Sequence, residues 1–554
     1  MIRIHDLSIP PLPESERRVL LEKKIRRFAG GILPSWKIAR RSVDARKKEE
    51  IRYIYTVDLE EMGEKKEAAL LKRARGFKAE QIKIEDYRLP EAGQEVLAER
   101  PLIIGAGPAG LFAAWMLATA GYQPLLLEQG APAEERDKDV QAFWAGGALK
   151  PWSNVQFGEG GAGTFSDGKL ATGIRDPEGR IREVLRIFAD CGADPSICYD
   201  AKPHIGTDCL KNVVRMMRQQ ITEKGGSFLF HTRLTGICTE QGRLKAACTE
   251  NTVTGEKREI PAEVMILAIG HSARETFLML HEAGVEMLPK GFAVGVRIEH
   301  PQSLINRIQY GTENPENLPP ADYKLTAKVE EGRSVYSFCM CPGGQVVNAS
   351  SEEGRLCVNG MSAHARDRRN ANAALVVQVE PADFEEGDLF AGMRFQRTCE
   401  EAAWKLCRGK VPVQRWAEFA GKGKTEGAEE SFAAAPAASL VTEADAPRPD
   451  ICGAWEMADL SSALPPFIRN ALLQAMPQFD RKMPGYASPE ALVEGFEGRT
   501  SSPLRIPRDA GGESSIRGIW PAGEGAGYAG GITSAAVDGI KAAEQIIRRF
   551  AVPK

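Results

Sequence analysis

The chain has 554 residues, with 72 Lys and Arg against 75 Asp and Glu and a net charge of −3. This length exceeds what one hydrophobic core supports, so we expect two or three domains. The near-neutral charge excludes a protein that binds nucleic acid over its whole surface. The charge is uneven, since residues 1–90 contain 22 Lys and Arg against 15 Asp and Glu. This basic excess indicates a separate N-terminal module.

The sequence predicts a cytoplasmic protein. No apolar run approaches the roughly 18 residues that span a bilayer, and Met1–Asp6 lacks the apolar core of a signal peptide. The 11 cysteines are odd in number and irregularly spaced, without a Cys-x-x-Cys pair. This pattern is typical of reduced thiols and indicates neither a thioredoxin-type disulfide nor a zinc ribbon, so no metal site is predicted.

Residues 1–95 are predicted to form a small α+β domain. Hydrophobic periodicity predicts strands at Ile2–Ile9, Trp36–Val43, Ile51–Leu59 and Ile82–Tyr87, with helices at Glu14–Phe28 and Glu60–Arg75. The order β-α-β-β-α-β is that of a ferredoxin-like sandwich. The Pro- and Gly-containing stretch Leu89–Pro101 links this domain to the next.

A dinucleotide-binding fingerprint follows the linker. The short strand Leu102–Ile104 runs into a Gly-x-Gly-x-x-Gly turn made by Gly105, Gly107 and Gly110, and then into a helix. Gly105 permits the tight turn, and Gly107 lets the backbone approach a pyrophosphate. Gly110 lets helix and strand pack closely.

The helix after this turn is predicted to hold the pyrophosphate. Its first turn contains Pro108 and Ala109, and the free N–H groups at a helix N-terminus favour negative charge. Glu128 ends a second apolar strand, Pro124–Leu127. Its carboxylate can accept hydrogen bonds from both hydroxyls of an adenosine ribose and would repel the 2′-phosphate of NADP.

A second glycine-rich run favours FAD over NAD as the cofactor. Pro521–Ala536 precedes a helix and resembles the closing motif of the glutathione-reductase-like flavoproteins, in which an acidic residue holds the ribityl chain. Such a helix N-terminus stabilises the anionic reduced flavin. The candidate residues here are Gly523, Glu524, Gly530, Gly531 and Ile532, with Glu524 where those proteins usually have Asp.

The remaining elements predict an inserted domain. A helix is expected at Thr207–Lys224 and, after a strand meander, a strand at Val264–Ile269 that leads into Gly270. Residues 291–504 have strand signals at Phe292–Ile298, Val335–Cys341 and Leu375–Val379, and Glu426–Asp450 is predicted to be a long loop. We therefore expect an FAD domain from residues 96–290 and 505–554, with a mixed, mostly β substrate domain at 291–504. The sequence contains no second Gly-x-Gly-x-x-Gly turn, so we do not expect a separate NAD(P)H-binding domain.

Several long motifs together resemble the uncharacterised bacterial FAD-dependent dehydrogenases, often labelled NAD(FAD)-utilising. These motifs are Asn154–Lys169, Gly270–Arg274, Gly295–Pro301, Arg499–Pro503 and the C-terminal glycine run. The resemblance covers nearly the whole chain. It implies FAD, an α/β fold with a glutathione-reductase-like Rossmann FAD domain, an inserted substrate domain and an extra N-terminal domain. It implies no particular substrate.

The loop Gly158–Gly163 has several free N–H groups suited to a pyrophosphate or flavin ring, which makes Gly160, Gly161, Gly163 and Thr164 further cofactor candidates. Next to it, Lys169 is a candidate catalytic cation near flavin N5 or a substrate carboxylate. The alternative is a solvated loop lysine.

Three further residues are candidates for catalysis. His271 is placed to reach the flavin edge, or alternatively shapes a backbone turn. Arg297 would orient a substrate carboxylate and His300 would move a proton, against the alternatives of a structural ion pair and a surface histidine.

Strand alternation places the thiols of Cys339 and Cys341 on one face. They are either redox partners of the flavin or buried structural cysteines. We favour structural cysteines, because a disulfide between residues i and i+2 is strained. Electrons are then expected to pass directly between flavin and substrate.

The basic N-terminal domain offers a second hypothesis, in which it binds RNA. Its Arg40, Arg41, Arg46, Lys47 and Lys48 surround the central turn, and Tyr53 and Tyr55 are the nearest match to base-stacking aromatics. A solvated basic face is favoured, so nucleic acid and membrane partners are not expected.

The sequence thus predicts an FAD-dependent oxidoreductase that moves a hydride between flavin N5 and a small-molecule substrate. NADH or NADPH is a candidate transient electron donor or acceptor, and saturation of an activated C=C bond is one form of the reaction. The alternative is an RNA-linked or regulatory flavoprotein that uses the N-terminal domain to bind its partner.

Overall fold

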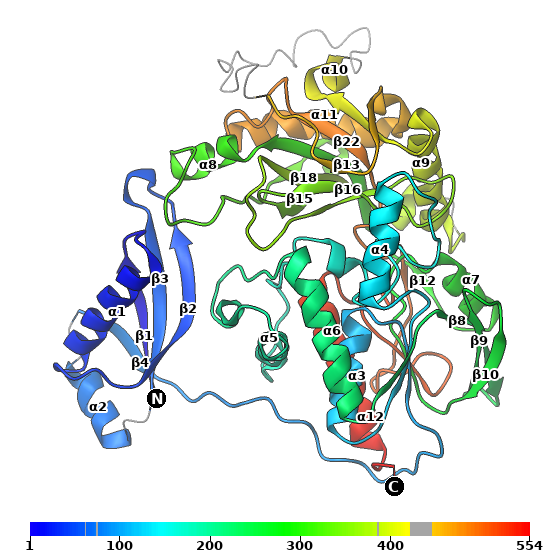
Figure 1. Ribbon diagram of the computed structural model, residues 1–554, viewed down its shortest axis with the longest axis horizontal. Helices are drawn as coiled ribbons and strands as arrows, with labels where there is room; N and C mark the ends of the chain where they lie inside the picture. The colour runs from blue at the N-terminus through cyan, green and yellow to red at the C-terminus, as the bar shows by residue number, and fades with distance from the viewer. Residues whose placement is uncertain (61–62, 74–75, 385–386, 422–445, 554) are drawn as a thin grey trace.

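The structure is a computed structural model that describes residues 1–60, 63–73, 76–384, 387–421 and 446–553. In Figure 1 the N-terminal elements, in dark blue, lie to one side of the rest of the chain. An extended light-blue segment joins them to the remainder and runs past the C-terminal helix. Backbone hydrogen bonds fasten this segment there, from Gly93 N to Ile547 O (2.8 Å) and from Glu95 N to Arg549 O (3.1 Å).

The N-terminal elements occur in the order predicted from the sequence. The strands form one antiparallel sheet in the order β2-β3-β1-β4, and Ile4 of β1 pairs with Val57 of β3. Alternate residues of the strands pack against Leu21 and Ile25 of helix α1. The elements are β1 (Ile2–Ile9), α1 (Glu14–Phe28), β2 (Trp36–Asp44), β3 (Arg52–Leu59), α2 (Glu64–Arg73) and β4 (Lys78–Gln81).

The prediction of a strand at Ile82–Tyr87 is wrong. The edge strand is β4, which pairs with β1 from Lys78 to Gln81. Pairing ends there because β1 begins at Ile2, opposite Gln81, so the chain beyond has no partner strand. The Tyr87 hydroxyl instead donates a hydrogen bond to Glu544 Oε1 (2.9 Å) near the C-terminus.

The middle of the chain and the C-terminus share a parallel sheet in the order β24-β11-β5-β6-β7. Alternation along β5 divides its side chains between two cores. Ile103 faces the helices α3, α6 and α12, which run side by side in Figure 1. Leu102 and Ile104 face the opposite core, shared with the meander β8–β10. Two chain segments more than 200 residues apart therefore make one sheet.

The elements of this part, with their bounds, are β5 (Leu102–Ile104), α3 (Pro108–Thr119), β6 (Leu125–Leu127), α4 (Ala133–Trp144), α5 (Arg180–Asp190), α6 (Thr207–Glu223), β7 (Ser227–Leu229), β8 (Thr232–Glu240), β9 (Arg243–Asn251), β10 (Lys257–Pro261), β11 (Met265–Leu267), α7 (Arg274–Glu282), β24 (Ile519–Pro521) and α12 (Ile532–Arg549).

Residues after the meander form a mostly β region. A seven-stranded sheet has the order β14-β15-β18-β13-β22-β19-β21, and a three-stranded sheet has the order β17-β16-β20. Helices α8, α9 and α11 were not predicted, although α9 and α11 each have 17 residues. The loop predicted at Glu426–Asp450 lies, as far as residue 445, outside the described residues.

The bounds in this region are β12 (Leu288–Pro289), β13 (Phe292–Pro301), α8 (Gln302–Tyr310), β14 (Thr326–Lys328), β15 (Ser334–Cys341), β16 (Gln345–Asn348), β17 (Val358–Met361), β18 (Asn370–Val379), α9 (Ala391–Cys407), β19 (Val411–Arg415), α10 (Trp416–Gly421), β20 (Ile451–Cys452), β21 (Trp455–Met457), α11 (Pro466–Lys482), β22 (Leu492–Glu497) and β23 (Leu504–Arg505).

Candidate functional site

The first glycine turn joins β5 to α3 and needs its glycines. Gly105 has φ +102°, and a Cβ there would lie 2.3 Å from the carbonyl oxygen of Ala268. A Cβ on Gly110 would lie 1.9 Å from the carbonyl oxygen of Gly105. Both positions therefore exclude a side chain, as the fingerprint predicts, and the turn leaves the N-terminus of α3 at a cavity.

The carboxylate of Glu128 joins three loops. Its Oε2 accepts a hydrogen bond from Ala106 N (2.8 Å), and its Oε1 accepts from Gly130 N (2.9 Å) and Gly158 N (3.0 Å). A carboxylate oxygen has two acceptor positions, so Oε2 retains one for a ligand. Glu128 is 6% exposed and lines the cavity.

Arg136 organises the glycine loop that follows, a role that was not predicted. Its fully buried guanidinium donates hydrogen bonds to the carbonyl oxygens of Asn154, Val155, Gly158, Glu159 and Gly161 at 2.7–3.3 Å. Burial lowers the pKa of Arg136 to about 10, although nearby carboxylates oppose the shift. The cation fixes the loop because five carbonyl oxygens point at it.

The C-terminal glycine run also borders this cavity. Gly530 and Gly531 line the cavity just before α12, and a Cβ on either would meet open space. Glu524 Oε2 is 3.3 Å from Nδ1 of His271, which follows β11. The Nε2 atom of His271 is buried and has no hydrogen-bond partner among the described residues.

These loops enclose one cavity of about 350 Å³. Thirteen of the sixteen predicted cofactor residues line it: Gly105, Gly107, Pro108, Ala109, Glu128, Gly161, Gly163, Gly270, Gly523, Glu524, Gly530, Gly531 and Ile532. Gly110, Gly160 and Thr164 lie behind this lining. A Cβ on Gly160 would lie 2.1 Å from Thr164 Oγ1, so these two hold the shape of the loop.

Two of the four predicted catalytic residues, Lys169 and His271, line the cavity. Lys169 Nζ is 2.8 Å from Asp167 Oδ2 and also bonds the carbonyl oxygen of Met340. Asp167 is fully buried and also bonds Arg366 and Ser362. Lys169 is therefore held in a network and is not a solvated loop lysine.

Arg297 and His300 are fully buried in β13 and lie outside the described cavity lining. Arg297 bonds Glu497 Oε2 (2.9 Å) and Asn372 Oδ1 (2.6 Å), which matches the structural ion pair that we held as the alternative. His300 Nε2 is 2.7 Å from the carbonyl oxygen of Tyr486, and burial lowers the pKa of His300 to about 4. The surface position considered for His300 is wrong, because all ten residues of β13 are buried.

The cavity wall also contains groups that sequence reasoning did not assign to the site. Phe338 and Cys339 at the end of β15, Asn359 of β17, and Glu497 and Arg499 near β22 all line it. They come from the mostly β region, whereas the glycine loops come from the parallel-sheet region. Of these, Cys339 was considered only as an alternative redox partner and Arg499 only as part of a family motif. No local motif marks Phe338, Asn359 or Glu497, because strand pairing brings them together from distant parts of the chain.

The N-terminal tyrosines are not free to stack on bases. Tyr53 is 7% exposed and Tyr55 is 2% exposed. The Tyr53 hydroxyl donates to the carbonyl oxygen of Asn317 (2.8 Å), and the Arg17 guanidinium covers the Tyr53 ring.

Arg41 forms a bidentate ion pair with Asp200, so part of the basic face contacts the rest of the chain.

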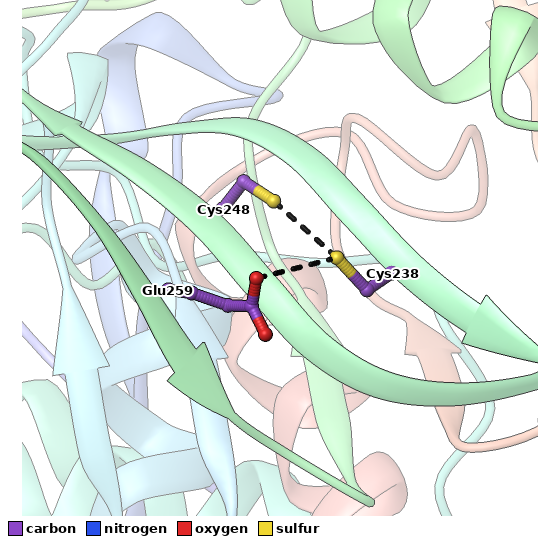
Figure 2. A group of neighbouring side chains, drawn as sticks. All are labelled: Cys238, Cys248 and Glu259. Atoms are coloured by element: carbon purple, nitrogen blue, oxygen red, sulfur yellow. Dashed lines mark hydrogen bonds between the residues drawn. The ribbon is translucent and has the colours of Figure 1, made fainter.

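A cysteine cluster lies away from the cavity, on the meander (Figure 2). Cys238 of β8 has its Sγ 3.5 Å from Cys248 Sγ on β9 and 3.8 Å from Glu259 Oε2 on β10. A Cβ on Gly236 would lie 3.3 Å from Cys248 Cβ, so this glycine leaves room for the pair.

Three family models match parts of the chain. Residues 291–500 match the C-terminal domain of FAD-dependent proteins, residues 103–132 match an NAD(P)-binding Rossmann-like domain, and residues 1–60 match a domain of unknown function. An uncharacterized protein of Clostridium beijerinckii is 45% identical over 522 residues, which is 93% of each chain.

Solved structures share less with the chain. A geranylgeranyl bacteriochlorophyll reductase-like protein of Thermoplasma acidophilum is 13% identical over 82% of this chain and 78% of its own, with a TM-score of 0.37. The glycerol-3-phosphate dehydrogenase of Bacillus halodurans, complexed with FAD, is 11% identical over 56% of this chain and 53% of its own, with a TM-score of 0.27. Within the described residues, no helix is both long and apolar enough to cross a membrane.

Proposed function

Because the chain belongs to the family of FAD-dependent flavoproteins that includes the Clostridium beijerinckii relative, we propose that it is an oxidoreductase that exchanges a hydride between a small molecule and flavin N5. One observation carries this proposal. A single cavity is walled on one side by the glycine loops and on the other by side chains of the mostly β region. A small molecule in it would lie between the cofactor-binding loops and those side chains.

The residues of the cavity fit FAD. The N-terminus of α3, where Gly107 is the N-cap and Pro108 the first helical residue, directs the free N–H groups of its first turn at a pyrophosphate. Glu128 Oε2 retains an acceptor position for an adenosine ribose. The open backbone at Gly530 and Gly531 presents the N-terminus of α12. FAD supplies a two-electron donor and acceptor when it is bound.

Two side chains are placed to act on a substrate. Lys169 provides a fixed positive charge, because Asp167 and the Met340 carbonyl oxygen hold its ammonium group at the cavity wall. His271 Nε2 is the buried nitrogen without a partner among the described residues, so it can hold or accept a proton there. Arg297 is not assigned to substrate binding, because it is fully buried and its guanidinium already donates to Glu497, Asn372, Asn359 and the carbonyl oxygen of Cys339.

The first experiment identifies the chromophore and the reductant. The purified protein is denatured and the released chromophore is chromatographed; we expect FAD, and FMN alone would overturn the cofactor assignment. The holoprotein is then mixed anaerobically with NADH, NADPH and a panel of small carboxylic acids in a stopped-flow instrument. We expect one of them to bleach the flavin. A flavin that dithionite reduces but none of these reagents reduces would contradict the proposed hydride exchange.

A pair of variants tests the assigned side chains. His271→Ala should slow flavin reduction by about 10²–10⁴-fold if Nε2 transfers a proton in that step. His281→Ala changes a histidine on α7 outside the described cavity lining and should leave the rate unchanged. Equal rates in the two variants would remove His271 from the reaction.

A further inference from the structure

Cys339 occupies an unusual position at the end of β15. The register of β15 against β18 shifts between Phe338 and Cys341, and Cys339 has φ +44°. In this bulge Phe338 and Cys339 both line the cavity, whereas Cys341 is fully buried behind it. The strand end thus delivers one thiol of the pair to the cavity and keeps the other inside.

Positive charges surround this strand end. Lys169 Nζ bonds the carbonyl oxygen of Met340, between the two cysteines. Arg297 Nη1 is 3.2 Å from the carbonyl oxygen of Cys339 and 4.0 Å from Cys341 Sγ. The thiol of Cys341 donates to the carbonyl oxygen of Cys339 at 3.2 Å.

The charges nearby do not balance when the thiols are neutral. In the ion pairs next to the bulge, three cations, Lys169, Arg297 and Arg366, share two carboxylates, Asp167 and Glu497. Two more carboxyls near Arg297 do not change this balance, because burial raises the pKa of Glu494 to about 8 and raises the pKa of Glu299 as well. Elsewhere on the cavity wall, His271 pairs with Glu524 and Arg499 pairs with Glu400. One negative charge at Cys339 would neutralise the excess, since an unpaired buried cation is costly.

The titration of the pair agrees with this geometry. The Cys341 thiol, together with Lys169 and Arg297, lowers the pKa of Cys339 although burial opposes the shift. The same interaction with Cys339, together with burial, raises the pKa of Cys341. One proton therefore stays on Cys341 while Cys339 ionises.

We propose that Cys339 is a resting thiolate and a nucleophile for small, uncharged carbon electrophiles that enter the cavity. With an activated alkene, Cys339 Sγ bonds the β carbon, the π electron pair moves to the α carbon, and that carbon takes a proton from solvent. With iodoacetamide, the S–C bond forms, the C–I bond breaks, and iodide leaves with the electron pair. This covalent site goes beyond hydride exchange, and its test does not require flavin turnover. A second group aimed into the same cavity is the buried His271 Nε2, unpartnered within the described residues.

The test is competition among the 11 cysteines for limiting iodoacetamide. The holoprotein is labelled at about pH 6.5, quenched at intervals, digested, and the label on each cysteine is measured by mass spectrometry. We expect Cys339 to react at least about tenfold faster than Cys198, because only thiolates react. Cys198 is an exposed residue, but partial desolvation of its thiol, together with Asp190, raises its pKa. The rate at Cys339 should stay nearly constant up to about pH 8, whereas the rate at Cys198 should rise with pH.

Variants and controls make the result decisive. Cys339→Ser should remove the fast label, and Cys341→Ala should move its pH dependence upward, whereas Cys209→Ser should change neither. Labelling of Cys339 no faster than Cys198 would overturn the proposal. A Cys339–Cys341 disulfide in anaerobically purified protein would also overturn it, in favour of a dithiol couple. The comparison of Cys339 with Cys198 uses the wild-type protein, so it does not depend on whether any variant folds.

Discussion

Two cysteine pairs in this protein lie in opposite electrostatic surroundings. On the meander, Cys238 Sγ lies 3.5 Å from Cys248 Sγ and 3.8 Å from the carboxylate of Glu259 (Figure 2). In the cavity wall, Cys339 and Cys341 lie beside ammonium and guanidinium groups.

The difference teaches that the pKa of each thiol depends first on the hydrogen bond with its partner cysteine and then on the sign of the nearby charges. A hydrogen bond with Cys248, burial and Glu259 together raise the pKa of Cys238 to about 11. The hydrogen bond with Cys341, together with Lys169 and Arg297, lowers the pKa of Cys339, although Cys339 and Cys238 are both partly buried. Cys339 is therefore expected to be ionised at neutral pH and Cys238 to stay protonated.

The largest effect on stability is expected from Asp167, the carboxylate that pairs with both Lys169 and Arg366. Asp167→Ala leaves Lys169 and Arg366 without this buried partner and should cost about 3–5 kcal/mol in the free energy of unfolding. Glu259→Ala removes an exposed carboxylate of the meander and should cost less than about 0.5 kcal/mol. Urea denaturation of both variants measures the difference.

The pH dependence of this effect has a definite sign. Lys169 and Arg366 lower the pKa of Asp167, although burial opposes the shift. Its contribution is therefore present above the unfolded carboxyl pKa of about 4 and is lost as the pH falls through the lower folded value. The stability gap between the wild type and Asp167→Ala should shrink below about pH 4. Equal losses in Asp167→Ala and Glu259→Ala would contradict the contrast between the two regions.

The next effect separates the regions by cofactor binding. Glu128→Ala removes the acceptor for three loop N–H groups and should weaken FAD binding by about 1–3 kcal/mol. Titration of FAD into the apoprotein measures the dissociation constant. Glu135→Ala, on an exposed face of α4, is the matched control and should bind FAD normally. The rate of Cys238 labelling should be unchanged in both variants, which would show that the meander remains folded. An unchanged dissociation constant for FAD in Glu128→Ala would rule out the proposed role of Glu128 in FAD binding.

A smaller effect is expected from one cavity cation. Lys169→Met should raise the pKa of Cys339 by about one unit, or about 1.4 kcal/mol, which moves the midpoint of the pH–rate profile for its alkylation upward by about one pH unit. The label on Cys238 should not change. Lys150→Met, which removes a half-exposed lysine paired with Asp139, is the control. Equal pH–rate profiles for Cys339 in the two variants would show that Lys169 does not set the charge of this thiol.

The parts of the site that the sequence predicted are those that depend on neighbours along the chain. Gly105 and Gly110 must be glycine because their turn and the helix after it leave no room for a Cβ, and the spacing of the motif encodes this requirement. Glu128 follows its strand directly. The N-terminal strands and the helix Glu14–Phe28 were predicted for the same reason, since their periodicity is local.

The parts that could not be predicted depend on contacts between distant segments. Lys169 meets Met340 only because the loop after the glycines packs against the end of β15. Arg136 appears in the sequence as one charge in a charged helix, and only the fold reveals five carbonyl oxygens around it. The cysteines of the cavity wall were predicted to share a face, but the bulge turns Cys339 into the cavity and leaves Cys341 inside.

The smallest effect tests the meander side of the comparison. Removal of the negative charge in Glu259→Gln favours the thiolate of Cys238, so its pKa should fall and its alkylation at about pH 8 should rise. The rise should be only about two- to threefold, because an exposed charge is screened by solvent and the larger cause, the hydrogen bond with Cys248, remains. Glu256→Gln removes a nearby exposed carboxylate that pairs with Arg258, and it should leave the rate unchanged. A rise of tenfold or more in Glu259→Gln would make the carboxylate the dominant cause. Equal rises in the two variants would show that net charge on the meander, and not contact with Glu259, contributes to keeping Cys238 protonated.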